Sequence, residues 1–180
     1  GDDKVNWFTG VKPVYDLEVR TYREYQEKEL VVNLPGAGQL KSELAKENPD
    51  YFVYRNIKVN GEIDKRDFDE LAGHYFKSID LSGAKVVGYE GYKADMVPGY
   101  AFYGNTYLEQ FQMPSGVREL GFNAFRSTKL KEIDLPETIT EFGLNTFNAC
   151  FELFMWVPIR SGARAGSDDS RVCRRTSRSH

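Results

Sequence analysis

The run Gly36-Ala37-Gly38 is the first stretch that could hold a chemical group, because it follows a predicted strand and precedes a predicted helix. Backbone N–H groups at such a position can bind a phosphate. No further glycine follows at the spacing of a dinucleotide-binding loop, and Leu40 stands before Lys41 where a Walker loop requires glycine. The run therefore predicts a structural turn rather than a phosphate site.

The histidines, cysteines and carboxylates form no recognisable catalytic or metal-ligating set. His74 has no second histidine nearby, His180 is terminal, and the carboxylates are scattered. Cys150 and Cys173 lie too far apart for a zinc motif, and no histidine is placed to activate either thiol. We therefore expect no enzyme, no metal and no cofactor. Core packing is the favoured interpretation of Cys150, and a disulfide with Cys173 stays open for an oxidising compartment.

The composition is that of an ordinary globular protein. The chain has 180 residues, 41% of them hydrophobic and 28% charged, with a net charge of −3. This length suffices for one domain with a sizeable core. The acidic balance gives no reason to expect a nucleic-acid partner. No apolar run approaches the roughly 18 residues that a membrane helix needs, so we expect no transmembrane segment.

The elements that organise the chain come from a repeat. "YAFYGNTYLEQFQMPSGVREL" (residues 100–120) is followed by "NAFRSTKLKEIDLPETITEF" (residues 123–142), at a nearly constant offset that is one position longer at the first phenylalanine. The matching pairs are Phe102 and Phe125, Leu108 and Leu130, Phe111 and Ile133, Met113 and Leu135, Pro114 and Pro136, and Val117 and Ile139. A third copy follows, in which the same places are taken by Phe147, Leu153 and Trp156. A period of about 22 residues indicates a solenoid.

Each copy reads as one coil of stacked structure. Ile133 and Leu135 point to one side of a strand and Asp134 to the other. We expect a second short extended segment with Ile139 facing inward, then a turn or short helix anchored by Phe147. No coil of this size buries its apolar side alone, whereas stacked coils share one continuous core.

The same spacing extends toward the N-terminus. Ile57 and Ile79 are separated by the interval that separates Phe111 and Ile133, so five rungs are predicted, at Ile57, Ile79, Phe111, Ile133 and Trp156. The interval between Ile79 and Phe111 is longer than the others. This extra length predicts an inserted loop at 82–98, which is rich in glycine.

These repeats resemble the BspA-type, or Treponema pallidum-type, bacterial leucine-rich repeat, whose usual coil reads roughly IGxxAFxxCxxLxxIxIPxSVTx. The upstream segments "LPGAGQLKSEL", "IKVNGEIDKRDFDEL" and "FKSIDLSGAKVV" resemble the N-terminal cap of such repeats in exported Bacteroidota proteins. The resemblance covers residues 30–158. The family's cysteine is present only as Cys150, with Asn105 and Thr128 at the corresponding places of earlier copies. The implied fold is an α/β leucine-rich-repeat solenoid of about five coils with an N-terminal α/β cap.

Four segments follow from these patterns. Residues 1–29 form an arm or edge hairpin, 30–75 the cap with the first rung, 76–158 the leucine-rich repeats, and 159–180 a basic non-repeat tail. Within the cap we expect strands at 30–34 and 51–59, the second closed by an Asn60-Gly61 turn, and helices at 39–47 and 65–73, the second capped by Asp64. Two interpretations of the tail stay open: a segment with little burial of its own, or a basic segment that binds an anionic surface.

The candidate binding face is a set of outward residues that recur with the coil. Ser78, Gln110 and Glu132 form one row; Asp80, Gln112 and Asp134 form another, with Lys58 one rung earlier. Tyr89 and Tyr92 on the inserted loop are a second candidate patch. The alternatives are that the rows serve only solubility and that the tyrosines fold back over the first rungs.

The resemblance implies adhesion to host or matrix proteins and contact between bacteria. We therefore expect a non-enzymatic, secreted or cell-surface module that binds a protein through the solenoid face, with a glycan as the less favoured partner. The alternative is a structural spacer or cap of a larger surface assembly, with no ligand of its own. We expect an extracellular or cell-surface location, with lipid anchoring through a segment absent from this sequence left open.

Overall fold

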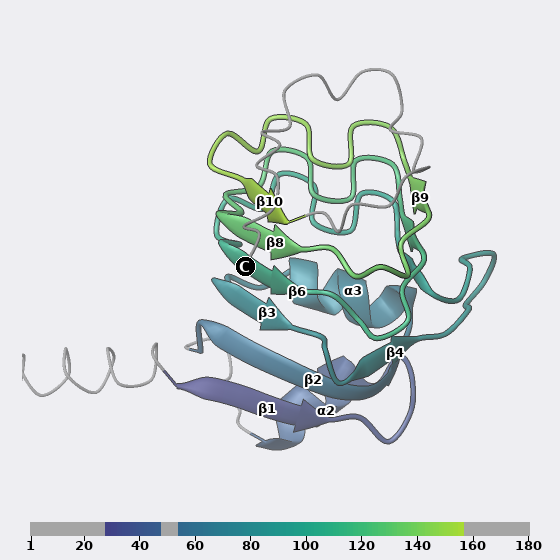
Figure 1. Cartoon of the computed structure of the whole chain (residues 1–180). Coiled ribbons are helices and arrows are strands. Elements are labelled where there is room, and N and C mark those ends of the chain that lie inside the picture. Colours follow the sequence, from purple (N-terminus) through teal and green to yellow (C-terminus); the bar gives the residue numbers. More distant parts are fainter. Residues whose placement is uncertain (1–27, 48–53, 157–180) are drawn as a thin grey trace, which may run out of the picture.

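The computed structural model describes residues 28–47 and 54–156 (Figure 1). In chain order the elements are β1 (Glu29–Asn33), α2 (Leu40–Glu47), β2 (Asn56–Ile63), α3 (Lys65–Ala72), β3 (Ser78–Asp80), β4 (Ala84–Val86), β5 (Met96–Val97), β6 (Gln110–Gln112), β7 (Glu119–Leu120), β8 (Glu132–Asp134), β9 (Glu141–Phe142) and β10 (Phe154–Trp156). They form an α/β fold built on parallel sheets, as the sequence predicts. The predicted tail, and the predicted arm apart from its last two residues, lie outside the described residues.

Four of the predicted rung residues stack across the larger sheet, whose strands pair in the order β1-β2-β3-β6-β8-β10. Ile57 lies opposite Ile79, and Ile79 lies opposite Phe111. Ile133 follows in β8, which pairs with β6 in the register that the repeat predicts. Each of the four side chains is at most 3% exposed. The repeat spacing therefore sets both the register of this sheet and its buried face.

The prediction of Trp156 as the fifth rung residue is wrong by one position. Met155 lies opposite Ile133, and Trp156 lies opposite Asp134. The alignment of the third copy placed Leu153 and Trp156 23 residues after Leu130 and Ile133, whereas the backbone ladder keeps an offset of 22 from Ile133 to Met155. Because strand positions alternate between two faces, this shift gives Trp156 the register position of the outer row.

The predicted loop at 82–98 contains two strands. β4 pairs with the C-terminal end of β2, and β5 begins a smaller parallel sheet of order β5-β7-β9. Val86 of β4 and Val97 of β5 are buried. Each strand therefore places an apolar side chain in the core, which favours the extended backbone over a loop. The glycines around these short strands hid their alternation in the sequence.

β2 also passes through the Asn60-Gly61 pair, which the sequence predicted as a turn. Gly61 has a φ of 104°, and a Cβ there would lie 2.6 Å from the carbonyl oxygen of Leu34. The Leu34 N–H donates to Asn60 O at 2.9 Å. Glycine is therefore needed here because two backbones meet, not because the chain reverses.

A row of phenylalanine rings joins the repeats to the cap. The rings of Phe102 and Phe125 stack at 5.6 Å, and those of Phe125 and Phe147 at 5.4 Å. Phe68 of α3 meets Phe102 edge to face at 6.2 Å. The turn predicted around Phe147 is thus confirmed, and the core continues from the cap into the last described repeat.

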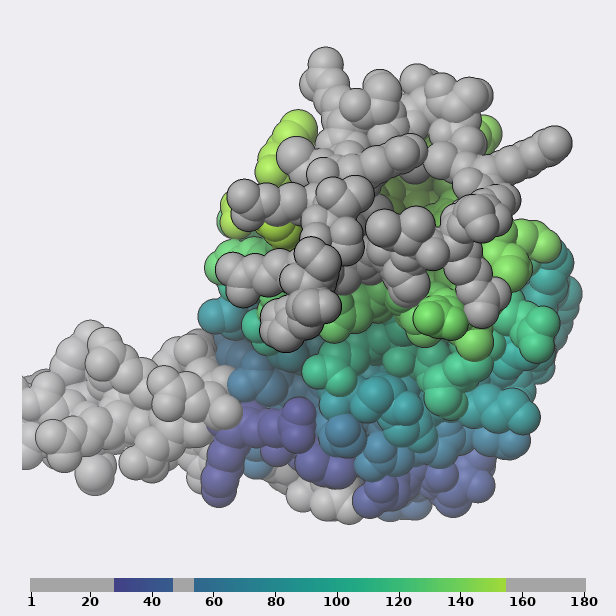
Figure 2. Space-filling view, in the orientation of Figure 1, coloured from purple at the N-terminus to yellow at the C-terminus, as the bar shows by residue number. Residues whose placement is uncertain are grey.

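A glycine in each repeat brings consecutive turns into backbone contact. A Cβ on Gly121 would lie 2.3 Å from the Gly99 nitrogen, and a Cβ on Gly143 would lie 2.3 Å from the Phe122 nitrogen. In Figure 2 the colours follow the chain order from purple through teal to green across one continuous body. The absence of a side chain at these positions sets the spacing between repeats.

The side chain of Asp67 ties the cap together. It is 1% exposed and accepts three backbone N–H groups: Gly38 at 2.6 Å, Leu40 at 2.9 Å and Asp64 at 2.9 Å. Asp64 caps α3, as predicted, and its side chain accepts from the Arg66 N–H. Burial raises the pKa of Asp67, although its backbone hydrogen bonds act in the opposite direction.

We predict that Gly121→Ala lowers the free energy of unfolding by about 1–3 kcal/mol, because the added methyl group overlaps the Gly99 backbone. Urea unfolding followed by circular dichroism measures the change. Gly36→Ala is the control, because the nearest atom to its Cβ is 3.4 Å away on the Gln39 side chain. Equal stability of the two variants would show that the turns have room between them.

We predict that Asp67→Ala lowers the free energy of unfolding by about 3 kcal/mol, because it leaves three backbone donors in the cap without their acceptor. Asp69→Ala on the same helix removes an exposed carboxylate that pairs with Lys65, so it should change stability by at most about 0.5 kcal/mol. A loss below about 1 kcal/mol for Asp67→Ala would contradict its role as the link between these segments.

Candidate binding surface

The outer face of the larger sheet carries most of the predicted candidate residues. Gln110 and Gln112 of β6 and Glu132 and Asp134 of β8 are exposed, and they flank buried residues at the centres of their strands. This alternation is what the repeat spacing predicts. The four side chains are brought together because β6 and β8 are adjacent and parallel, with Gln110 opposite Glu132.

Asp80, predicted for the same outer row, is largely buried instead. It is 7% exposed; its Oδ2 lies 2.6 Å from Lys58 Nζ, and its Oδ1 accepts the Ser82 N–H at 2.8 Å. The backbone after β3 bends so that Ser82 meets this carboxylate, which the strand pattern alone did not show. Lys58 and Ser78 are half-buried, so the rows are open mainly on β6 and β8.

The ion pair between Lys58 and Asp80 shifts both pKa values. Burial acts to raise the pKa of Asp80, but the hydrogen bonds from Lys58 and Ser82 and the Lys58 charge outweigh it and hold that pKa below its usual range. The hydrogen bond and charge of Asp80 raise the pKa of Lys58. The pair is therefore charged at neutral pH and stabilises the first rungs.

A row of alternating charges borders this face, and the sequence reasoning missed it. Glu109 Oε2 lies 2.6 Å from Lys131 Nζ and 3.6 Å from Lys77 Nζ. The hydrogen bond from Lys131 lowers the pKa of Glu109, and Glu109 raises that of Lys131. The sequence signal that could have revealed this row is that Lys77, Glu109 and Lys131 each immediately precede a rung strand.

Tyr89 and Tyr92 do not join the rows on the sheet. The Arg66 guanidinium lies 4.1 Å from the centre of the Tyr89 ring, and Lys65 Nζ lies 5.3 Å from that of Tyr92. The two tyrosines pair through an antiparallel bridge. They lie against the start of α3, whereas the alternative interpretation placed them over the first rungs.

The residues first considered for chemistry have structural contacts. The Gly38 N–H donates to Asp67, which agrees with the predicted turn. His74 Nε2 lies 2.9 Å from Glu70 Oε1. Among the described residues Cys150 is a free thiol; it donates to Phe125 O at 2.9 Å and lies 3.2 Å from Thr128 Oγ1. Cys173, the candidate disulfide partner, lies outside the described residues. In the described part of the chain, histidine, cysteine and carboxylate side chains form no group of three that could hold a metal ion.

We predict that Asp80→Asn lowers the free energy of unfolding by about 1 kcal/mol at pH 7. Because the folded-state pKa of Asp80 lies below its unfolded value, the difference from wild type is present above about pH 5 and shrinks as the pH falls toward about 3. Urea unfolding at several pH values measures it. Asp134→Asn is the matched control, since Asp134 is exposed on the same row. A difference that stays constant down to pH 3 would contradict the ion pair.

The repeats of this chain are similar to a known family of proteins. Residues 92–156 match the family described as BspA type leucine rich repeat region (6 copies). A search of curated proteins found no match. Within residues 28–47 and 54–156, no helix has the length and apolar character needed to cross a bilayer. The matched segment begins at Tyr92 and ends with β10, so it contains the phenylalanine row from Phe102 to Phe147 and the exposed strands β6 and β8. The chain therefore carries a BspA-type leucine-rich repeat region over residues 92–156.

Proposed function

We propose that this chain is a non-enzymatic binding module that recognises a protein partner through the outer face of its larger sheet. The observation that carries the proposal is the exposed set Gln110, Gln112, Glu132 and Asp134 on adjacent parallel strands of fixed register. The sheet fixes the backbone positions of these side chains, so their spacing is set before a partner binds.

The repeat family supports the proposal, because leucine-rich repeats are protein-interaction modules. We further propose that the repeats form a solenoid of about five coils, with rungs from β2 to β10. The support for this shape is the constant register between successive rung strands and the stacked phenylalanine rings between turns. A solenoid presents a long, continuous sheet face to a partner.

Exposed apolar side chains at the margins of this face add to the case. Val31 on β1 is 46% exposed and lies opposite Lys58, and Phe154 on β10 is 47% exposed and lies opposite Glu132. Protein interfaces commonly combine polar groups with exposed aromatic and aliphatic contacts. We propose that the module acts outside the cell or at the cell surface, where host, matrix or bacterial proteins are the candidate partners.

The test is an array of matrix proteins and bacterial surface proteins probed with the full chain. For a partner found there, the double variant Glu132→Lys/Asp134→Lys should weaken binding at least about tenfold, because it reverses two exposed charges at the centre of the proposed face. The variant Glu90→Lys/Glu141→Lys makes the same change in net charge at exposed positions outside the larger sheet, before β5 and on β9, and should bind as wild type.

Equal loss in the two double variants would indicate net charge rather than this face. If no protein on the arrays binds, the outcome contradicts the proposal and favours a structural spacer or cap of a larger surface assembly.

A further inference from the structure

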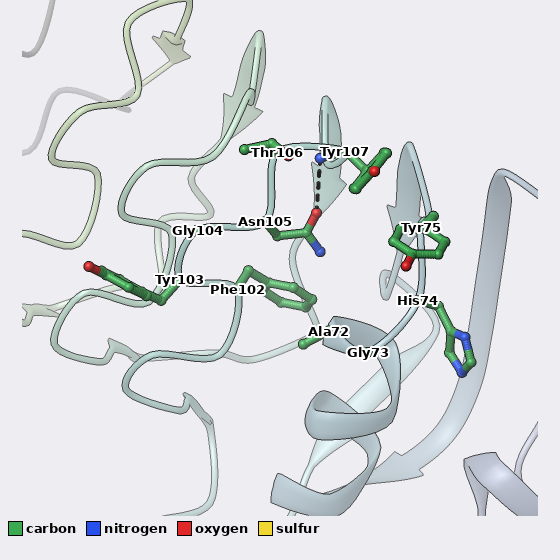
Figure 3. A pocket seen from close by; sticks show the side chains of 10 residues that line it. All are labelled: Ala72, Gly73, His74, Tyr75, Phe102, Tyr103, Gly104, Asn105, Thr106 and Tyr107. Atoms are coloured by element: carbon green, nitrogen blue, oxygen red, sulfur yellow. Dashed lines mark hydrogen bonds between the residues drawn. The ribbon is translucent and has the colours of Figure 1, made fainter.

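A pocket partly bounded by tyrosines lies where the turn at residues 102–107 passes over the C-terminal end of α3 (Figure 3). Its volume is about 210 Å³. Phe102 forms the floor and is 1% exposed. Tyr75 and Tyr107 stand on one side, with their rings meeting edge to face at 4.7 Å. The pocket is therefore a small, open site with an apolar floor and an aromatic wall.

The polar groups of this pocket are almost all uncharged. Asn105 Oδ1 accepts the N–H groups of Tyr107 and Leu108, at 3.1 and 3.2 Å, which directs its Nδ2 toward the space between Phe102 and Tyr75 (Figure 3). Among the described residues that line the pocket there is no lysine, arginine or carboxylate. The Arg55 guanidinium is not part of the lining, but it lies 6.0 Å from the centre of the Tyr107 ring, and its Nη1 donates to Tyr75 O at 3.2 Å. Because the lining itself offers mainly amide and hydroxyl groups, its chemistry favours a ligand rich in hydroxyl or amide groups.

A second group of exposed aromatic rings lies on the neighbouring turns, and it includes Tyr103, whose side chain points away from Tyr75 and Tyr107 (Figure 3). Tyr103 is 52% exposed, Tyr100 57% and Phe122 40%. The Tyr100 ring lies 5.7 Å from that of Tyr103 and 5.3 Å from that of Phe122. Single exposed apolar residues are ordinary, but contiguous ones mark recognition sites. We use the name tyrosine surface for the pocket wall of Tyr75 and Tyr107 together with these three rings.

The backbone at Tyr100 gives independent support for a role of its ring. Tyr100 has a φ of 60°, in the left-handed region, and the corresponding residues of the next two repeats are Asn123 at 54° and Asn145 at 57°. Asparagine tolerates this conformation better than tyrosine does. A bulky residue kept in an unfavourable conformation, with its ring on the surface, points to a function for that ring.

We propose that the tyrosine surface and its pocket bind a neutral oligosaccharide. The apolar C–H face of a sugar ring fits against a tyrosine ring, and its hydroxyl groups exchange hydrogen bonds with Asn105 Nδ2, the Thr106 hydroxyl and the tyrosine hydroxyls. This site involves the turns rather than the outer face of the sheet, so it is separate from the proposed protein-binding face.

Isothermal titration calorimetry of the full chain tests the proposal with hexasaccharides of glucose, mannose and N-acetylglucosamine, and with a hyaluronan octasaccharide as the acidic counterpart. We expect one or more of the neutral probes to bind and hyaluronan to bind more weakly. Tyr107→Ala and Tyr103→Ala should each weaken binding at least about tenfold. Asn105→Asp keeps the oxygen that accepts the turn hydrogen bonds but removes the amide donor, so it should weaken binding without unfolding the turn.

Tyr100→Asn separates a ligand role from a structural one. It should weaken sugar binding while leaving the midpoint of thermal unfolding unchanged or raising it by about 3 °C, because asparagine suits the left-handed backbone. The double variant Glu132→Lys/Asp134→Lys on the sheet face should leave sugar binding unchanged, so failure of this site and failure of the protein-binding face are distinguishable.

Three results would overturn the proposal. The first is that none of the neutral probes binds at about 10 mM, a concentration that detects even weak sites. The second is that binding persists unchanged in the tyrosine and Asn105 variants. The third is that Tyr100→Asn lowers the unfolding midpoint and leaves binding intact, which would assign the ring to folding.

Discussion

The backbone ladder between successive parallel strands is the constraint on which the rest of this structure depends. Ile57, Ile79 and Phe111 lie opposite one another because each strand donates to and accepts from the next in a fixed register. A single strand of three residues buries almost nothing, so each repeat is stable only through its neighbours. The ladder also decides which side chains face outward, since a shift of one residue would exchange the buried and exposed faces.

Two contacts between turns reinforce the ladder. Phenylalanine rings stack from Phe102 through Phe125 to Phe147 inside the turns, and Gly121 and Gly143 bring the backbones of consecutive turns together. These contacts share the repeat period, so strand, turn and ring spacing agree. At the N-terminal end of the sheet, the buried carboxylate of Asp67 accepts hydrogen bonds from Gly38 and Leu40, which precede β2 in the chain, and from Asp64, which follows it. These hydrogen bonds hold the segments next to the first rungs together.

The same period produces two surfaces of different chemistry. The outer face of the sheet presents amides and carboxylates that alternate with the core residues, and its charged borders are paired, as Glu109 is with Lys77 and Lys131. The turn side instead presents tyrosine rings, because its outward positions are occupied by residues such as Tyr100 and Tyr103. A polar face of fixed spacing suits a protein partner, while an exposed aromatic surface suits a sugar.

The sequence by itself determined the repeat, the buried rung residues, the capped helix α3 and the outward rows on β6 and β8, because all of these follow from local spacing and side-chain alternation. The tertiary structure alone decided the burial of Asp80, the strand through Gly61, the register of Trp156 and the contact of Tyr89 with Arg66. Each of these depends on which distant backbone or charge comes within a few ångströms, and a linear pattern does not contain that distance. The pocket beside Asn105 is of the same kind, since its walls come from a helix end and a turn that meet only when the repeats stack on the cap.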